Sequence, residues 1–262
     1  MFQSSLKEAQ AFQDFYLPKT GSYYRDNRNY SYDFKNKRNT TSLLSPYIRY
    51  RLLSEEDIIK KTLSINSFSK TEKFIQEIYW RTYWKGWLEH RPEVYDDYLM
   101  QKNELLKNIY NTTNYKKTIE GETYLPFFND WVKKLKKDGY LHNHIRMWFA
   151  SIWIFTLELP WQLGANFFME NLLDGDPASN TLSWRWVAGI QTKGKHYLAR
   201  KNNIIKYGNV DINENIKLNE HAVCLEENKS YFATDLDFHN SETDDLDSIL
   251  IPTDDLNFVL NN

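Results

Sequence analysis

Cysteine is almost absent from this sequence, and its scarcity excludes several classes of site. Cys224 is the single cysteine among 262 residues. One thiol forms no internal disulfide and supplies too few ligands for an iron–sulfur cluster or a structural zinc. Long apolar runs are missing as well, since no stretch approaches the ~18 apolar residues that a membrane-spanning helix needs. We therefore expect no disulfide, no cysteine-held metal and no membrane partner.

The amino terminus lacks the apolar core of a secretory signal. Its opening residues, MFQSSLKEAQAF, are mostly polar. A signal peptide would place about 7–15 apolar residues after a short basic stretch. We therefore expect a cytoplasmic protein.

Negative charge is scarce in most of the chain and concentrated at one end. Residues 211–262 hold 13 Asp and Glu but only 2 Lys, a local charge of −11, whereas residues 1–210 hold 31 Lys and Arg against 22 Asp and Glu, a charge of +9. This profile is common in proteins that meet polyanions, and it also fits a solvated surface with a flexible tail. The change predicts a domain over residues 1–211 and a loosely structured acidic tail over residues 212–262.

Strand-like alternation is scarce too, whereas helical spacing recurs. Large apolar groups repeat at helical intervals in four segments: residues 71–89, 127–137, 141–159 and 161–173. Ser54, followed by three acids, is typical of a helix start, and Gly139 and Pro160 are typical of helix ends. The polar, weakly periodic sequence of residues 1–40 predicts a short helix followed by a long loop. The predicted fold class is all-α.

The segment with the most chemistry is DGDPASNTLSWRW, residues 174–186. Its two carboxylates, Asp174 and Asp176, would cost several kcal/mol if they were buried without partners. Arg146 lies in a predicted buried helix, so we expect it to pair with Asp174. Asn143 precedes Arg146 by three residues and shares its helix face. The cluster fits either a structural salt bridge or a pocket for a polar heterocycle, and composition does not choose between them.

Two histidines flank Asn143 in the string HNH, residues 142–144, which invites a metal or nuclease interpretation. Positions two apart on a helix point about 200° apart. The two imidazoles therefore cannot share one ion, and no metal site is predicted.

Three segments resemble, in order, the flavin- and lesion-pocket segments of the DNA photolyase/cryptochrome family: FIQEIYWR at 74–81, HNHIRMW at 142–148 and DGDPASNTLSWRW at 174–186. TSLLSPY at 41–47 looks like the family's loop for FAD phosphates. The resemblance extends from about residue 22 to residue 209. It implies the family's helical FAD-binding domain in a short form without the N-terminal α/β antenna domain, so no antenna pigment is expected.

The resemblance also implies which residues surround the flavin ring of an FAD cofactor. Asn180 matches the position facing N5, where an amide can hydrogen-bond a protonated nitrogen. Asp176 would bond to the N3–C4 edge, Asn143 would lie by the ring, and the Arg146–Asp174 pair would pack against it.

At the phosphates, the resemblance implies that Thr41, Ser42 and Ser45 offer hydroxyl and backbone N–H groups near a helix start. Arg81 would add positive charge there, although TSLLS alone is typical of an ordinary helix-capping loop. The implied FAD-binding residues are Tyr24, Thr41, Ser42, Leu44, Ser45, Phe74, Glu77, Arg81, Asn143, Arg146, Asp174, Asp176 and Asn180.

For the lesion, the resemblance implies roles for three residues. Glu77 matches a carboxyl group that hydrogen-bonds a cyclobutane pyrimidine dimer, Trp80 an aromatic wall and Met147 a thioether that packs on the dimer. Apart from the resemblance, Trp80 and Met147 would be plain helical core. Lys193 and Lys195 belong to a basic stretch that would form a nucleic-acid rim beside the pocket.

Photoreduction in the family passes along tryptophans, of which Trp184 and Trp161 match the first and second. The third position falls at Thr118, which cannot relay an electron. Alternative relays are aromatic residues among which the sequence does not choose: Tyr115, Tyr124 and Trp153. The implied catalytic residues are Glu77, Asn180, Trp184 and Trp161.

The function that the resemblance implies is FAD-dependent, light-driven repair of cyclobutane pyrimidine dimers by electron transfer from reduced flavin, a lyase reaction on damaged DNA. Without an antenna domain, part of a duplex-binding surface is missing, so we expect a preference for single-stranded DNA. Two alternatives stay open. One is a cryptochrome-like blue-light photoreceptor whose acidic tail changes pose, and the other is a flavoprotein with a redox or scaffold role. We expect a monomer or weak dimer.

Overall fold

A computed structural model describes residues 5–31, 40–109 and 112–236, and these residues contain helices but no strand, which confirms the all-α prediction. The elements are α1 (Leu6–Tyr16), the 3₁₀ turn η1 (Leu17–Lys19), α2 (Ser22–Asn27), α3 (Ser45–Arg49), α4 (Glu55–Ile65), α5 (Phe68–Glu89), α6 (Glu93–Ile109), α7 (Thr113–Glu120), α8 (Pro126–Asp138), α9 (Asn143–Ser151), the π-helical turn η2 (Ile152–Thr156), α10 (Trp161–Asn171), α11 (Pro177–Ala188) and α12 (Lys201–Gly208). The prediction of one helix before residue 40 missed α2.

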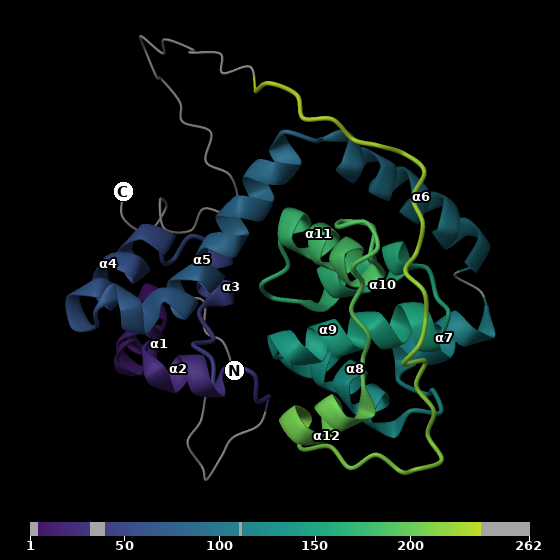
Figure 1. Cartoon of the computed structure of the whole chain (residues 1–262), viewed down its shortest axis with the longest axis horizontal. Coiled ribbons are helices and arrows are strands. Elements are labelled where there is room, and N and C mark those ends of the chain that lie inside the picture. The colour runs from purple at the N-terminus through teal and green to yellow at the C-terminus, as the bar shows by residue number, and fades with distance from the viewer. Residues whose placement is uncertain (1–4, 32–39, 110–111, 237–262) are drawn as a thin grey trace.

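Helix α5 joins two groups of helices (Figure 1). On one side, α1 to α4 pack on the first half of α5 around a small core that includes Tyr16, Ile58 and Phe74. On the other side, α6 to α12 surround a larger aromatic core that includes Trp148 and Trp153. The two groups therefore meet along α5, which is where a cavity between them can form.

Two helix ends follow the local signals in the sequence. The Ser54 side chain accepts a hydrogen bond from the Asp57 N–H and so caps α4. Gly139 ends α8 in the left-handed conformation with φ 64°, and a Cβ there would lie 2.5 Å from Leu173. Both predictions are confirmed, and glycine is required at residue 139 by conformation and by space.

The helix predicted up to Pro160 is shorter and less regular than its apolar pattern indicates. α9 ends at Ser151, and the following turn is π-helical, with Leu157 N–H donating to the Ile152 carbonyl five residues earlier at 2.8 Å. The Trp153 indole N–H donates to the Pro160 carbonyl at 2.9 Å. Trp153 lies within this wide turn. The spacing of apolar residues in the sequence does not predict either the π-helical turn or the bond from Trp153 to Pro160.

After α12 the chain crosses the molecule as a strap, by which we mean residues 219–236 (Figure 1). It has no helix or strand but is tied to the body along its length. Leu225 N–H donates to the Ala188 carbonyl at 2.9 Å, and Thr234 N–H donates to the His90 carbonyl at 2.8 Å. This part of the predicted acidic tail is thus held by specific contacts, while residues 237–262 lie outside the described residues.

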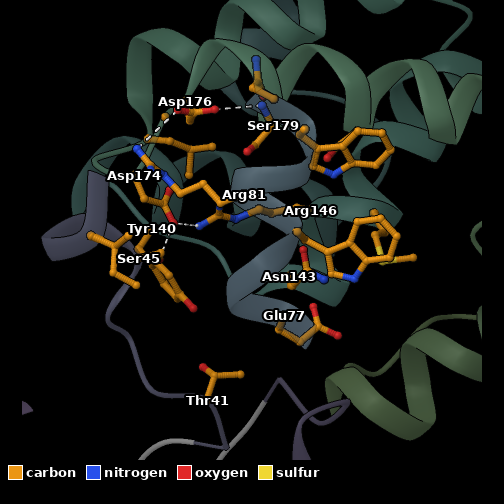
Figure 2. A pocket seen from close by; sticks show the side chains of 18 of the residues that line it. Thr41, Ser45, Glu77, Arg81, Tyr140, Asn143, Arg146, Asp174, Asp176 and Ser179 are labelled. Carbon is orange, nitrogen blue, oxygen red and sulfur yellow. Dashed lines mark hydrogen bonds and ion pairs between the residues drawn. The ribbon is translucent and has the colours of Figure 1, made fainter. Parts of the chain in front are cut away.

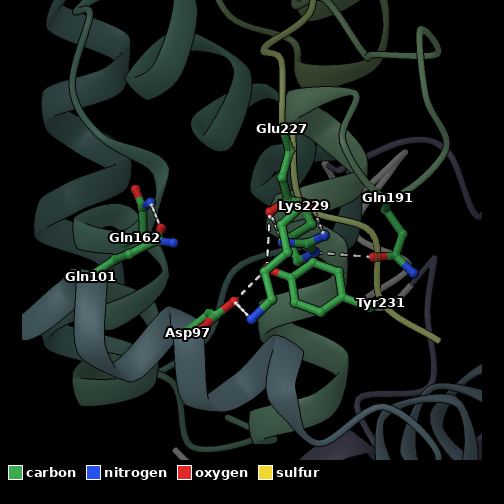
Figure 3. Close-up of polar contacts among 8 residues, drawn as sticks. Asp97, Gln101, Gln162, Gln191, Glu227, Lys229 and Tyr231 are labelled. Carbon is green, nitrogen blue, oxygen red and sulfur yellow. Dashed lines mark hydrogen bonds and ion pairs between the residues drawn. The ribbon is translucent and has the colours of Figure 1, made fainter. Parts of the chain in front are cut away.

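The strap carries a buried ion pair at its centre (Figure 3). Glu227 accepts two hydrogen bonds from the Arg185 guanidinium, at 2.7 and 2.6 Å, and Arg185 is 3% exposed. Lys229 and Tyr231 both bond to the Asp97 carboxylate on α6, at 2.6 and 2.9 Å. These contacts clamp α6 and α11 together across the strap.

Among the described helices, none combines the length and hydropathy needed to cross a membrane.

Candidate functional site

A cavity of about 540 Å³ lies between α5, α9 and α11, and the loops before α3 and before α11 form part of its lining. Its size falls within the range of small-molecule and cofactor pockets, about 300–1,000 Å³. Aromatic and aliphatic side chains form much of the wall, including Phe74, Ile78 and Phe168.

The cavity brings together most of the residues that the sequence singled out. All thirteen predicted FAD-binding residues line it, and so do three further predicted residues: Trp80, Met147 and Trp184. Trp161, Lys193 and Lys195 are not among the lining residues. Trp161 is buried and stacks on Tyr98 with ring centroids 5.5 Å apart, and the two lysines are exposed around the turn that follows α11.

One end of the cavity is built around the predicted pair of Arg146 and Asp174 (Figure 2). The Arg146 Nη2 donates to Asp174 Oδ2 at 2.8 Å, and the Ser45 hydroxyl donates to the same oxygen. Burial alone would lower the pKa of Arg146, but the charge and hydrogen bond of Asp174 raise it overall. The second carboxylate oxygen, Asp174 Oδ1, is buried without a hydrogen-bond partner. The predicted pairing of Arg146 with Asp174 is therefore confirmed, and it leaves Asp174 Oδ1 without a hydrogen bond.

A second charged group joins α4, α5 and α11. Asp176 caps α11 by accepting from Ser179 N–H at 2.9 Å, and its other oxygen lies 3.6 Å from Arg81 and 3.7 Å from Lys85. Arg81 also donates to Glu55 at 2.8 Å. Arg81 is thus held between two carboxylates on the cavity wall. The Ser179 hydroxyl beside it is buried and has no partner.

The inner face of α11 contributes Asn180 and Trp184. The Asn180 amide N–H donates to the Ala165 carbonyl at 2.8 Å, which leaves Oδ1 as the atom that can accept a hydrogen bond from a ligand. Trp184 lies against Gly164, where a Cβ would come within 2.3 Å of the indole ring. α10 therefore approaches the indole through a glycine, and the Trp184 indole N–H is buried without a partner.

On the α5 side the cavity wall includes Glu77 and Trp80, and Trp80 is 47% exposed. We call this exposed side the mouth of the cavity. The Glu77 carboxylate accepts a hydrogen bond from Arg28, a residue that the sequence offered no signal to select. Trp80 and Trp84 stack with ring centroids 5.5 Å apart and an interplanar angle of 25°. Trp84 was missed although its spacing from Trp80, four residues on a helix, could have found it.

Several other lining residues were missed as well, and two of them, Tyr140 and Leu43, have unusual surroundings or backbone geometry. Burial raises the pKa of the Tyr140 phenol, which lies under the Arg146 guanidinium at 5.1 Å from ring centroid to carbon. Leu43 adopts a positive φ of 57°, a costly conformation for a branched residue that tends to occur at ligand clamps. Backbone strain of this kind leaves no trace in an apolar pattern, whereas Tyr140 lies only three residues before Asn143.

The predicted electron relay is only partly connected by ring contacts. Trp184 packs edge-to-face on Trp153 at 6.1 Å, and Trp153 packs in the same way on Tyr115 at 6.1 Å. Thr118 is buried, and its hydroxyl donates to the Asn114 carbonyl at 2.8 Å. Of the alternative relays named from the sequence, Trp153 and Tyr115 thus continue from Trp184, and this route stays a prediction.

Across the described part of the chain, no three His, Cys, Asp or Glu side chains come together as metal ligands do. His142 instead caps α9 by accepting the His144 backbone N–H on its ring nitrogen at 3.2 Å. Burial, together with the nearby charges of His144 and Arg146, lowers the pKa of His142 to about 4. The imidazole is thus neutral near pH 7.

Three polar atoms of residues that line the cavity are buried without a hydrogen-bond partner: Asp174 Oδ1, the Trp184 indole nitrogen and the Ser179 hydroxyl. Such atoms are uncommon in folded proteins, and here they gather around one cavity. The aromatic and aliphatic walls between these atoms suit a flat ring system.

Comparison with known proteins supports this picture. A sequence model of the family described as the FAD binding domain of DNA photolyase matches residues 74–215, more than half of the chain. A deoxyribodipyrimidine photo-lyase of Alkalihalophilus pseudofirmus is 30% identical over 158 residues, which cover 60% of this chain and 33% of the relative. A photo-lyase of the same name from Streptomyces griseus is 30% identical over 153 residues, with 58% and 33% covered.

Solved structures agree on the fold. A bacterial class III photolyase from Agrobacterium tumefaciens superposes with a TM-score of 0.63 at 26% identity, covering 78% of this chain and 43% of that one. A Synechocystis cryptochrome gives a TM-score of 0.64 at 23% identity, covering 79% and 44%.

This chain spans about a third of the length of the curated relatives it matches. The match over residues 74–215 contains most of the cavity-lining residues. The chain therefore belongs to the family of the FAD binding domain of DNA photolyase.

Proposed function

We propose that this chain binds FAD in the cavity and uses it for light-driven repair of cyclobutane pyrimidine dimers, with a preference for single-stranded DNA. The observation that carries the proposal is the meeting of two groups of side chains in one cavity. Asp174, Arg146 and Asn180 provide directed polar groups on the inside, while Glu77 and Trp80 stand at the mouth. Family membership and relatives named deoxyribodipyrimidine photo-lyase support the same reaction.

When bound, reduced FAD supplies, after absorbing light, one electron that opens the cyclobutane ring and is taken back once the two pyrimidines separate. Asn180 would present Oδ1 to the N–H of the ring nitrogen N5. Arg146 and Asp174 would lie against the ring. Apolar walls such as Phe168 exclude water, which strengthens each of these polar contacts.

At the mouth, the Glu77 carboxylate would accept a hydrogen bond from the dimer. Its bond to Arg28 holds the carboxyl group in place before a substrate arrives. The stacked pair of Trp80 and Trp84 supplies an aromatic wall beside it. A lesion must leave the base stack to enter such a pocket, and that step costs least in a single strand.

A photoreceptor function is the second candidate, and the strap is the observation that favours it. Glu227 and Tyr231 connect the C-terminal segment to α6 and α11, the helix that carries Trp184. A change at the cavity would therefore reach the strap through α11.

Repair of a dimer-containing oligonucleotide tests the proposal. Protein loaded with FAD and reduced should restore thymine absorbance only in blue or near-ultraviolet light, and Glu77→Gln should slow repair about tenfold or more while FAD remains bound. Glu72→Gln, an exposed acid on the same helix outside the cavity, is the matched control. A protein that binds FAD, is photoreduced and repairs nothing would refute repair and favour the photoreceptor. A protein that takes up no FAD would refute both.

A further inference from the structure

Helix α5 presents a continuous face of aromatic side chains that begins at the cavity and runs outward. Its members are Tyr79, Trp80, Tyr83, Trp84 and Trp87, which we call the aromatic ridge. Tyr79 is 55% exposed, Trp80 47% and Tyr83 52%, values far above those of core aromatics. At 100° per residue these five positions span about 140° of the helix surface. Exposed aromatic residues in such number mark an interaction surface.

The ridge is physically continuous with the mouth of the cavity. Trp80 and Trp84 line the cavity and also pack on Tyr83, whose ring lies 5.4 Å from Trp80 and 5.1 Å from Trp84. A chain of bases that delivers one member to the cavity would therefore pass directly over Tyr83.

Beyond Tyr83 the ridge becomes a shallow groove. Tyr79, Tyr83 and Trp87 form its sides together with His90, and Gly86 lies between them. A Cβ at Gly86 would meet nothing within 4 Å, so the floor of the groove is open. A flat ring can therefore lie against the tyrosines there without displacing any described atom.

The charges along the ridge suit a polyanion. Lys73 lies on α5 seven residues before Trp80, and Arg91 follows the end of α5, four residues after Trp87. The Arg91 guanidinium lies 4.6 Å from the centroid of the Trp87 ring. Aromatic rings bordered by cations are the arrangement that binds single-stranded nucleic acid, where unpaired bases stack on rings and phosphates meet cations.

We propose that the aromatic ridge is a stacking platform for the unpaired bases next to the nucleotide that enters the cavity. Tyr79 and Tyr83 bind the flanking bases by their ring faces, so the ridge selects single strands, because the bases of a duplex are already stacked on one another. The proposal rests on the proposed function for the lesion in the cavity. Binding of an undamaged strand tests the ridge by itself.

The experiment measures binding of a fluorescein-labelled, undamaged thymidine oligonucleotide to the full chain by anisotropy at several salt concentrations. Tyr79→Ala and Tyr83→Ala should each weaken binding about tenfold, the effect of losing one stacked base. The slope of log affinity against log salt should not change, because neither ring contacts a phosphate. Tyr124→Ala, which removes another exposed tyrosine at 60% exposure, is the control and should bind like the parent chain.

Gly86 provides a second, independent variant. Gly86→Glu would fill the groove and add negative charge beside the phosphates, so binding should weaken at least tenfold. Gly86→Ala should bind like the parent, since its methyl group meets no neighbour. This pair separates the groove from any general effect of replacing a helical glycine.

Three results would refute the proposed role of the ridge. The first two are equal affinity of the parent chain and Tyr83→Ala for the single strand, and no binding of the strand by the parent chain. The third is a parent chain that forms a protein dimer which Tyr83→Ala dissociates, while the affinity for the strand stays the same. Repair of a free dinucleotide dimer by the parent is measured alongside. Its absence would refute the proposed repair function and leave the result for the ridge standing.

Discussion

Replacing Glu227 tests whether the strap is part of the folded domain. Glu227→Ala removes the carboxylate that accepts two hydrogen bonds from Arg185. The guanidinium is left buried, with one remaining hydrogen bond to Gln191 Oε1 at 3.2 Å and the Tyr231 ring 5.4 Å away.

The size of the effect follows from the burial of the two partners. Breaking a buried ion pair by removing one partner costs about 3–5 kcal/mol. The Glu227 side chain is 20% exposed while that of Arg185 is 4% exposed, so water reaches part of the gap. We therefore expect a loss of about 2–3 kcal/mol in the free energy of unfolding. For a chain of this size that corresponds to a melting temperature lower by about 4–10 °C.

Thermal and urea unfolding followed by far-ultraviolet circular dichroism would measure this loss. Glu226→Ala, an exposed neighbour, is the control and should stay within about 0.5 kcal/mol of the parent. The double replacement Arg185→Met with Glu227→Met should recover most of the stability, because no unpaired charge then remains. Equal stability of Glu227→Ala and Glu226→Ala would refute the reasoning.

The same contacts decide where the chain can be shortened. A stop after residue 211 removes Glu227, Lys229 and Tyr231 together, so we expect it to destabilise the domain at least as much as Glu227→Ala. A stop after residue 236 keeps these strap contacts and should therefore lower the melting temperature less than a stop after residue 211 does. Only the second truncation is therefore suited to testing the role of residues 237–262.

Two further predictions concern the cavity, and a third concerns His142, the residue that caps α9. Gly164→Ala should displace the Trp184 ring, because a Cβ at residue 164 would lie 2.3 Å from it. The uptake of FAD, measured by flavin absorbance after reconstitution, should therefore fall. Unchanged uptake would contradict the close packing of Gly164 on Trp184. Asp174→Asn should lower FAD affinity about tenfold or more by leaving Arg146 without its charge partner, as measured by fluorescence titration, whereas equal affinity would show that the pair does not serve the cofactor. Burial lowers the pKa of His142 to about 4, below the unfolded value of about 6.5. Between these pH values only the unfolded state takes up the proton, so the free energy of unfolding is highest above pH 6.5 and falls as the pH drops toward 4. The parent should lose about 2 kcal/mol more than His142→Asn between pH 7 and pH 5 in denaturant unfolding, and parallel curves would refute the assignment.

Residues that lie close together in the chain could be grouped from the sequence, because helical spacing and clustered polar residues are visible within a single segment. The spacing of Asn143 and Arg146 on one helix and the acids and amide of the segment 174–180 indicated a polar cluster. The family resemblance then assigned that cluster to a cofactor pocket, and all five residues line the cavity. Electrostatics then predicted the pairing of Arg146 with Asp174, since two buried charges of opposite sign must meet.

Contacts between distant segments could not be assigned in this way. Arg28 meets Glu77, and Arg185 meets Glu227, across separations of 49 and 42 residues. Many arginine–carboxylate pairings were open to the unfolded chain, and only the packing of α5 and α11 selects these two. The same holds for Lys193 and Lys195, whose charge was visible in the sequence but which do not line the cavity.

The sequence by itself determined the helical class and the helix ends at Ser54 and Gly139, because periodicity and capping act over a few residues. Its resemblance to a known family selected thirteen of the residues that line the cavity. The tertiary structure decided that the strap is tied to the body and that the aromatic face of α5 stays exposed. Those outcomes depend on which surfaces remain uncovered once all segments have packed, a property of the whole fold and of no single segment.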